Sequence, residues 1–358
     1  MHRRRLAKLR QAMTAKRLDS LLVTDIPNVF YLSGFTGSTA AMVVTHKDAM
    51  ILVDSRYSIQ ARDECKQVTV KDFAIKTAMA AAAELVNELK PKSVGYEAGS
   101  VTVAAYKEID KIIERGITRR ATTGLVEKLR AVKDSHEIEL VRKACGFTDL
   151  AFKAILGEIK PGMTEKEVAL QLEYLLQKLS GGSLAFTTIV ATGPHSAWPH
   201  AQPGQAVIEK GHNLKMDFGA RYGKYCADIT RTVFIGKPDA KQREIYQIVK
   251  DAQMKAIEAI APGKLGKEID AAGRDYITEK GYGENFGHGL GHMLGIVVHD
   301  GLGFSKTSET VLEPGMVLTV EPGIYIEGWG GVRIEDDVLV TDTGVEVITK
   351  APKDLISL

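Results

Sequence analysis

Along the first part of the chain, apolar runs alternate with segments whose apolar residues recur at helical spacing. This pattern predicts short strands at 20–24, 40–45, 49–53 and 93–96, and helices at 77–89 and 101–114. The second and third strands are expected to form a hairpin that turns at residues 46–48. Such alternation is typical of a small α/β domain. Before it, Leu6, Leu9 and Met13 predict an amphipathic helix.

A change of pattern follows this region. The polar stretch 119–124 lacks periodicity, and we place a linker near it that extends to about residue 133. Cap chemistry at Asp134 and a capping box at Thr164–Glu167 then open two long helices. We therefore predict an N-terminal α/β domain at 1–124, a linker at 125–133 and a C-terminal α+β domain at 134–358.

A short internal echo bears on the C-terminal domain. Residues 159–162 and 166–168 match residues 260–263 and 267–269 at a constant offset. Each copy leads into a helix, a glycine-containing turn and a strand-rich segment, which predicts a pseudo-twofold internal repeat. Pro-Gly before a helix is also common punctuation, so the echo alone leaves chance open.

Composition narrows the class of protein. Hydrophobic residues make up 44% of the 358 residues and charged residues 26%, as in ordinary globular proteins. The net charge is only +2, which favours neither a nucleic-acid nor a membrane partner. Three widely spaced cysteines indicate a reducing compartment. The basic residues 2–5 resemble the start of a signal peptide, but the charges that follow argue against one, so we expect a cytoplasmic protein.

Four carboxylates lie in strand-like segments of the C-terminal third. The segments 214–220 and 225–234 read as a hairpin in which Asp217 and Asp228 roughly face each other. Two like charges in an apolar strand pair are destabilising unless a cation lies between them. The alternative is two aspartates at exposed strand ends.

The segments 317–325 and 331–340 repeat this arrangement with Glu321 and Glu335. A glutamate among Val, Ile and Leu is unfavourable to bury alone. Alternatively, Glu335 pairs only with Arg333 on its own strand or points to solvent.

Three of the nine histidines, His288, His292 and His299, lie in one glycine-rich window. His288 and His292 have the spacing of a helical metal pair, but the glycines make a regular helix doubtful. We expect one metal ligand here, with the other two histidines binding substrate or stabilising charge. By itself, the loop at 192–200 is only weak evidence for a functional site. Four carboxylates with one imidazole suit a pair of divalent ions that activate a water for hydrolysis.

The segments that contain the candidate ligands resemble those of a known protein family. Asp217, Asp228, His292 and the segments 321–323 and 331–336 resemble the metal-binding segments of the pita-bread metallopeptidases. The chain is most similar to the Xaa-Pro aminopeptidases and Xaa-Pro dipeptidases, also called prolidases. Residues 28–38 and 54–57 resemble a creatinase-type N-terminal domain. The resemblance spans nearly the whole chain.

The resemblance implies a fold, a cofactor and roles for residues. It implies two divalent ions, usually manganese and otherwise cobalt, zinc or iron. Asp228 and Glu335 would bridge the ions, Asp217 would bind one, and His292 and Glu321 the other. Glu321 would also shuttle a proton. His200, His288 and His299 match histidines that contact substrate or stabilise the reaction intermediate, Arg333 matches an arginine behind the ligands, and Trp198 lies at the substrate entrance.

Substrate preference rests on one departure from the family. Many prolidases carry an arginine shortly after the position of His299 that binds the carboxylate of a dipeptide, and residues 300–304 contain none. This favours an aminopeptidase that removes the residue before proline from longer peptides. The alternatives are an Xaa-Pro dipeptidase, a non-catalytic peptide-binding relative, or the metal-free creatinase reaction. The intact ligand set argues against the last two. A homodimer is expected from the resemblance alone.

Overall fold

A six-stranded mixed sheet organises the N-terminal part of the computed structural model, which describes residues 1–358. The strand order is β4-β3-β2-β1-β5-β6. The pairs β1–β2 and β2–β3 are antiparallel, whereas β3–β4, β1–β5 and β5–β6 are parallel. The strands are β1 Ser20–Val23, β2 Ala41–Thr45, β3 Ala49–Asp54, β4 Thr69–Phe73, β5 Ser93–Glu97 and β6 Thr118–Thr122. The predicted hairpin of β2 and β3 is confirmed.

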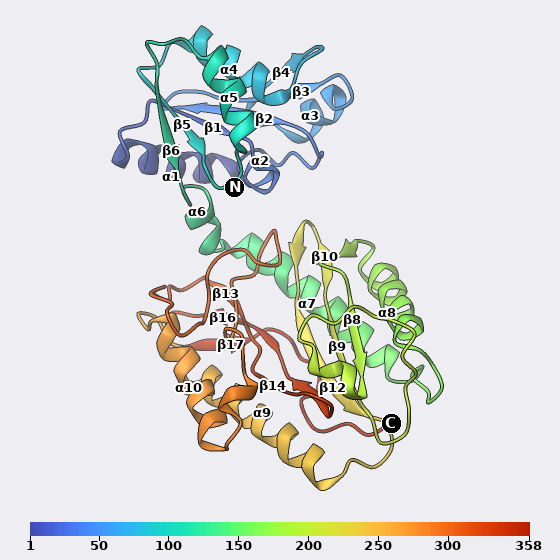
Figure 1. Ribbon diagram of the computed structural model, residues 1–358. Helices are drawn as coiled ribbons and strands as arrows, with labels where there is room; N and C mark the ends of the chain where they lie inside the picture. The colour runs from blue at the N-terminus through green and yellow to red at the C-terminus, as the bar shows by residue number, and fades with distance from the viewer. The chain divides into compact units, whose positions relative to one another are not determined.

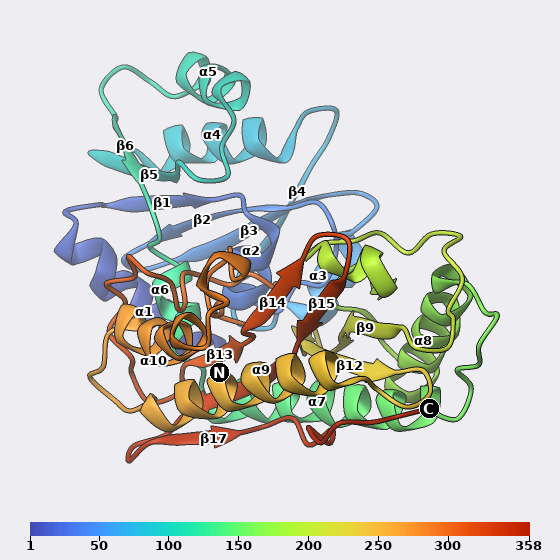
Figure 2. The same ribbon diagram turned by 60° about the horizontal axis from the view of Figure 1, so that its bottom comes forward.

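Helices cover both faces of this sheet. Helices α4 and α5 pack on one face, and α1 and α2 lie on the other (Figures 1 and 2). Their bounds are α1 His2–Ala15, α2 Ile26–Ser33, α3 Ser58–Glu64, α4 Ala78–Leu89 and α5 Val103–Ile112. Leu6, Leu9 and Met13 of α1 are buried, as their spacing predicts. Thr77 and Thr102 cap α4 and α5 through their side chains.

The chain divides by internal contacts into two compact units, Met1–Arg130 and Ala131–Leu358. The interpretation of 119–124 as the start of a linker is wrong for its first residues, because Arg119 to Thr122 belong to β6. A short helix, α6 Glu127–Ala131, follows. The predicted limits 1–124, 125–133 and 134–358 otherwise stay a proposal.

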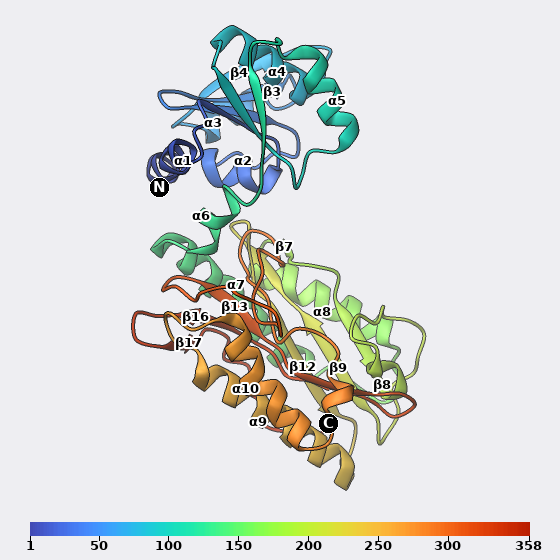
Figure 3. The same ribbon diagram turned by 60° about the vertical axis from the view of Figure 1, so that its left-hand side comes forward.

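Two helix pairs flank the strands of the second unit (Figure 3). They are α7 Ser135–Ile155 with α8 Glu165–Ser180, and α9 Ala240–Ala259 with α10 Gly266–Glu279. Capping boxes at Asp134 and Thr164 are present, as predicted. Each pair closes an apolar core, α7 and α8 against one group of strands and α9 and α10 against the other. No helix of the structure combines the length and apolarity that spanning a bilayer requires.

The strands of this unit form several small sheets. Three sheets have three strands each, in the orders β12-β9-β8, β13-β16-β17 and β11-β10-β7, and a fourth consists of β14 paired with β15. The strands are β7 Ser183–Leu184, β8 Ile189–Thr192, β9 Asn213–Phe218, β10 Ala220–Tyr222, β11 Tyr225–Cys226, β12 Ile229–Phe234, β13 Val317–Val320, β14 Gly323–Ile326, β15 Gly330–Arg333, β16 Asp336–Val340 and β17 Val345–Val347. Short 3-10 helices occur at η1 Gly193–Ala197 and η2 Gly283–Asn285.

The internal echo has a structural counterpart. The amide of Gly162 donates to the carbonyl of Ile208 at 2.9 Å, and the amide of Gly263 donates to that of Leu312 at 2.8 Å. Both glycines have positive φ, at 94° and 84°, a backbone region that glycine adopts without strain. In each half of the unit, the two helices of the pair are therefore joined by the same turn, held by an equivalent backbone hydrogen bond.

Candidate metal centre

Interruptions between strands position the carboxylates. Asp228 immediately precedes β12, Glu321 separates β13 from β14, and Glu335 separates β15 from β16. Asp217 lies within β9, and its partner across the ladder is Thr230. Asp217 and Asp228, predicted to lie roughly opposite each other, are therefore offset by two residues along the hairpin.

The ladder is interrupted at Gly219 and Asp228. Strand β9 pairs with β12 as far as Phe218 and Ile229, and β10 pairs with β11 in the same register from Arg221 and Cys226 onwards. Between these pairs, a Cβ atom on Gly219 would lie only 1.8 Å from the carbonyl oxygen of Ala227, so the close approach of the two strands requires glycine there. The backbone amide of Asp228 donates to Oδ2 of Asp337 at 2.9 Å.

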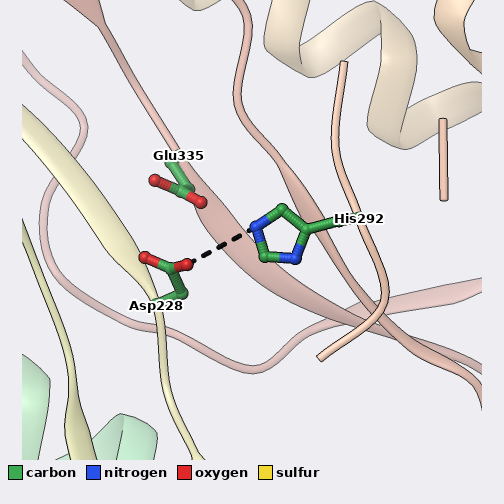
Figure 4. A group of neighbouring side chains, drawn as sticks. All are labelled: Asp228, His292 and Glu335. Atoms are coloured by element: carbon green, nitrogen blue, oxygen red, sulfur yellow. Dashed lines mark ion pairs between the residues drawn. The ribbon is translucent and has the colours of Figure 1, made fainter. Parts of the chain in front are cut away.

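Three side chains from distant segments meet in one cluster. Asp228, His292 and Glu335 each offer a ligand atom, and these atoms all lie within 4.8 Å of one another (Figure 4). Glu335 is only 1% exposed, so the interpretation that it points to solvent is wrong. Glu321 adjoins the cluster, with its Oε1 3.5 Å from Nε2 of His292. Four of the five predicted ligands are thus in mutual proximity.

Hydrogen bonding fixes the state of His292. Its Nδ1 lies 3.2 Å from the carbonyl of Met293, which can only accept, so Nδ1 carries the proton. Burial lowers the pKa of His292 to about 4, and the ring is therefore neutral. The lone pair of Nε2 faces Asp228 at 3.6 Å and Glu321. A neutral imidazole held in this tautomer is the form that binds a metal ion.

The fifth predicted ligand, Asp217, contacts Arg333. The Arg333 guanidinium pairs with Oδ2 of Asp217, and Glu335 accepts a hydrogen bond from Thr230, so the interpretation in which Glu335 pairs only with Arg333 is wrong. Nε of Arg333 donates to the hydroxyl of Thr230 at 2.8 Å, and that hydroxyl donates to Glu335 at 2.6 Å. Arg333 and Thr230 therefore support two ligands without joining the cluster themselves.

The buried carboxylates of the cluster favour the binding of cations. Burial, together with repulsion from neighbouring carboxylates, raises the pKa values of Asp228 and Glu335 well above their usual range. Oδ1 of Asp217 and Oδ1 of Asp228 are buried without a hydrogen-bond partner. Oxygen atoms of this kind are suited to divalent ions, so the residues present fit the predicted metal pair.

All five ligands line one cavity of about 290 Å³. Four other residues to which the resemblance assigned roles also line it, namely His200, His288, His299 and Arg333. The apolar part of the wall consists of Phe186, Ile189, Pro199 and Val298. The ring of His299 packs on that of His292, with centroids 4.2 Å apart. Trp198 is not part of the wall and stands beside it, 65% exposed.

His288 differs in its hydrogen bonding from His200 and His299, the other two histidines of the wall that are not predicted ligands. Its Nδ1 lies 2.8 Å from the carbonyl of Gly289, and its Nε2 lies 2.9 Å from the hydroxyl of Tyr325. Burial lowers the pKa of His288 to about 3. Both nitrogens of this neutral ring are engaged, which leaves no N–H to donate to a substrate.

Three residues around the site escaped the sequence analysis. They are Lys215, Thr230 and Tyr325. Lys215 and Thr230 lie two residues from Asp217 and Asp228, and the alternation of side chains along a strand was the available signal. No comparable signal marks Tyr325, whose role depends on contacts with Arg333 and His288.

Comparisons with known proteins agree with this geometry. The family model described as metallopeptidase family M24 matches residues 139–342, and that of the creatinase/prolidase N-terminal domain matches residues 5–132. The chain is similar to an Xaa-Pro dipeptidase of Pyrococcus furiosus, with 37% identity over 98% of this chain and 99% of the relative.

Two solved structures resemble the whole chain. That of an Xaa-Pro dipeptidase from Bacillus anthracis has a TM-score of 0.96 and 42% identity, and the match covers 100% of both chains. That of an X-Pro aminopeptidase from Thermotoga maritima has a TM-score of 0.89 and 37% identity, with 97% of this chain and 100% of that chain covered.

Proposed function

Because the chain belongs to metallopeptidase family M24 and carries a creatinase/prolidase N-terminal domain, we propose that it is an Xaa-Pro dipeptidase. The family assignment confirms the resemblance drawn from the sequence. It also confirms the predicted fold class, a creatinase-type α/β domain followed by an α+β pita-bread catalytic domain. The chain is thus a peptidase whose family uses divalent metal ions.

The dipeptidase proposal replaces the aminopeptidase that the sequence favoured. Among the relatives named for an activity, dipeptidases and prolidases predominate. The observation that carries the proposal is the match along the whole of both chains to the Xaa-Pro dipeptidase of Bacillus anthracis. The cavity of about 290 Å³ lies at the lower end of ligand pockets and has room for a dipeptide. The aminopeptidase stays a second candidate because residues 300–304 lack an arginine and because the Thermotoga maritima relative bears that name.

We assign the metal ions to the five predicted ligands. Asp228 and Glu335 would contact both ions, Asp217 one of them, and His292 and Glu321 the other. When bound, two divalent ions would supply Lewis acidity and lower the pKa of a water between them. We propose manganese from the resemblance, with cobalt, zinc and iron as alternatives.

Residues of the chain handle the substrate around that centre. The apolar wall of Phe186, Ile189, Pro199 and Val298 would receive the proline ring. His200 and His299, which face the same cavity from its exposed side, would contact the peptide carbonyl and carboxylate. Trp198 would border the entrance.

Two further roles concern the proton and the arginine. Burial raises the pKa of Glu321 to about 7, so this carboxylate can accept and return a proton near neutral pH. Arg333 would fix Asp217 and steady Tyr325, to whose hydroxyl it donates at 3.0 Å. We assign His288 to the same task, since it holds the hydroxyl of Tyr325 and has no free N–H.

Other expectations from the sequence stay proposals. A proline-containing peptide is the proposed substrate, and neither nucleic acid nor a membrane is proposed as a partner. A homodimer and a cytoplasmic location also remain predictions. The non-catalytic alternative is disfavoured because all five ligands line one cavity.

A product assay tests the proposal. Protein freed of metal with a chelator and reloaded with manganese is given an Xaa-Pro dipeptide and the matching Xaa-Pro-Yaa tripeptide. Asp228→Ala serves as the control for a contaminating protease. We expect a higher kcat/KM for the dipeptide and no activity in the variant. Preference for the tripeptide would establish the aminopeptidase instead, and hydrolysis of neither peptide would refute both candidates.

A further inference from the structure

A lysine lies buried beneath the loop that carries His200. Lys215 is in β9, two residues before Asp217, so strand alternation turns both side chains to the same face. Lys215 is 0% exposed, and its hydrogen bonds go to carbonyl oxygens rather than carboxylates. A buried ammonium is unfavourable unless polar groups replace its water.

Backbone carbonyl oxygens of one short segment take the place of this water. Nζ of Lys215 donates to the carbonyl oxygens of Ser196 at 3.0 Å, Trp198 at 2.6 Å and Pro199 at 3.4 Å. Burial and the nearby Arg333 lower the pKa of Lys215 well below its usual range. The three carbonyl acceptors nevertheless match the three donors of an ammonium, whereas a neutral amine has only two. The carbonyl of Trp198 accepts no other hydrogen bond. Hydrogen bonds from a charged donor are stronger than neutral ones, so this loop is held firmly.

The same lysine joins the loop to residues of the second half. Nζ of Lys215 lies 5.0 Å from the ring centroid of Tyr325, within the range of a cation–π contact. Arg333 donates to the hydroxyl of Tyr325 and, at 3.1 Å, to the carbonyl of Pro199. Two buried cations therefore converge on the residue immediately before His200.

We propose that Lys215 is a positioning residue that holds the segment 196–199 so that His200 faces the metal ligands. The inference rests on the proposed function, because it takes His200 to contact substrate. Methionine at position 215 would fill a similar volume but supply no donor. The carbonyl of the buried Ser196 and that of Trp198 would then lack their donor, and the loop would have to move for the Ser196 carbonyl to reach water.

Trp198 itself can report this movement. The chain has two tryptophans, so Trp329→Phe leaves Trp198 as the single emitter. In that background, Lys215→Met should lower the fluorescence anisotropy of Trp198 and increase its quenching by acrylamide. The kcat/KM for an Xaa-Pro dipeptide should fall roughly 10- to 100-fold, as expected when a catalytic group is misplaced. Bound metal should stay unchanged, because Lys215 is not a ligand, whereas the melting temperature should fall because three hydrogen bonds of a buried side chain are lost.

A matched control separates loop anchoring from the aromatic contact. Nζ of Lys241 also lies 5.0 Å from an aromatic ring, that of residue 329, and contacts no part of the loop. Lys241→Met should therefore change neither the Trp198 signals nor kcat/KM. If Lys215→Met fails to fold, Lys215→Gln, with two donors and no charge, is tested by the same readouts.

The outcomes discriminate between the two proposals. Unchanged Trp198 anisotropy and quenching in a folded Lys215 variant would overturn the role of Lys215. A mobile Trp198 with unchanged kcat/KM would overturn the placement of His200. If the unmodified protein cleaves no Xaa-Pro peptide, the proposed function fails, while the fluorescence still decides whether Lys215 anchors the loop.

Discussion

Thr230 gives the sharpest test of how the ligands are held. Its hydroxyl donates to Oε2 of Glu335 at 2.6 Å and accepts from Nε of Arg333 at 2.8 Å. Thr230→Val nearly preserves the shape of the side chain and removes both bonds. Glu335 then keeps its charge but loses the donor that sets its direction.

The magnitude follows from these two contacts. A hydrogen bond to a charged group contributes about 1.5–3 kcal/mol, and each 1.4 kcal/mol changes an equilibrium constant about tenfold. We therefore expect the metal affinity of Thr230→Val to fall about 10- to 100-fold, in line with other residues that support metal ligands. The metal-free protein should lose about 1–3 kcal/mol of unfolding free energy, because Nε of Arg333 is left buried without an acceptor.

A neighbouring threonine provides the control. Thr232 lies two residues further along β12 on the same face, and its hydroxyl bonds only to the backbone N–H and C=O of Arg333. Thr232→Val should lower stability without lowering metal affinity. Competition with a coloured chelator measures the affinity, and urea unfolding of the metal-free protein measures the stability. Parental metal affinity in a folded Thr230→Val protein would show that the hydroxyl does not hold Glu335.

Two other variants test separate parts of the molecule. His200→Ala should retain its metal, because His200 lies outside the ligand cluster. Its kcat should fall about 10²–10³-fold, as when a hydrogen-bond donor to the transition state is lost. Loss of metal would instead place His200 among the ligands. In the N-terminal unit, burial raises the pKa of Glu97 from 4.5 to about 7. Its folded form thus holds a proton that the unfolded form has lost, and stability should fall by up to about 3 kcal/mol as the pH rises from 4.5 to 7. Urea unfolding across this range should show no such fall in Glu97→Gln, and equal slopes would contradict the assignment.

Local chemistry along the chain was sufficient to predict α1, α4, α5, α7 and α8, whereas α2, α3, α6 and α9 were not predicted. Capping boxes at Asp134 and Thr164 set where α7 and α8 begin, because both partners of each box are only three residues apart. Strand β6 was missed because its sequence, Thr118–Thr122, is polar and lies at the edge of the sheet. An edge strand forms by backbone pairing with one neighbour, so its side chains need no apolar pattern.

The sequence likewise predicted one part of the site and missed another. Residue type and neighbours predicted a metal site formed by Asp217, Asp228, His292, Glu321 and Glu335, and the structure places all five along one cavity. The sequence did not predict which atoms of the site residues already have hydrogen-bond partners. His288 was expected to bind substrate or stabilise charge, and its hydrogen bond to Tyr325, 37 residues away, can be known only once the chain has folded.

The distribution of charge around the ligands explains why particular carboxylates are proposed to bridge. Four ligand carboxylates share the neighbourhood of two buried cations, Arg333 and Lys215. Arg333 pairs with Asp217, whereas Lys215 is engaged by loop carbonyls. Asp228 and Glu335 pair with no arginine or lysine, and theirs are the ligand pKa values raised most by burial and repulsion. We therefore propose that these two carboxylates, which most need added positive charge, are the ones that contact both ions.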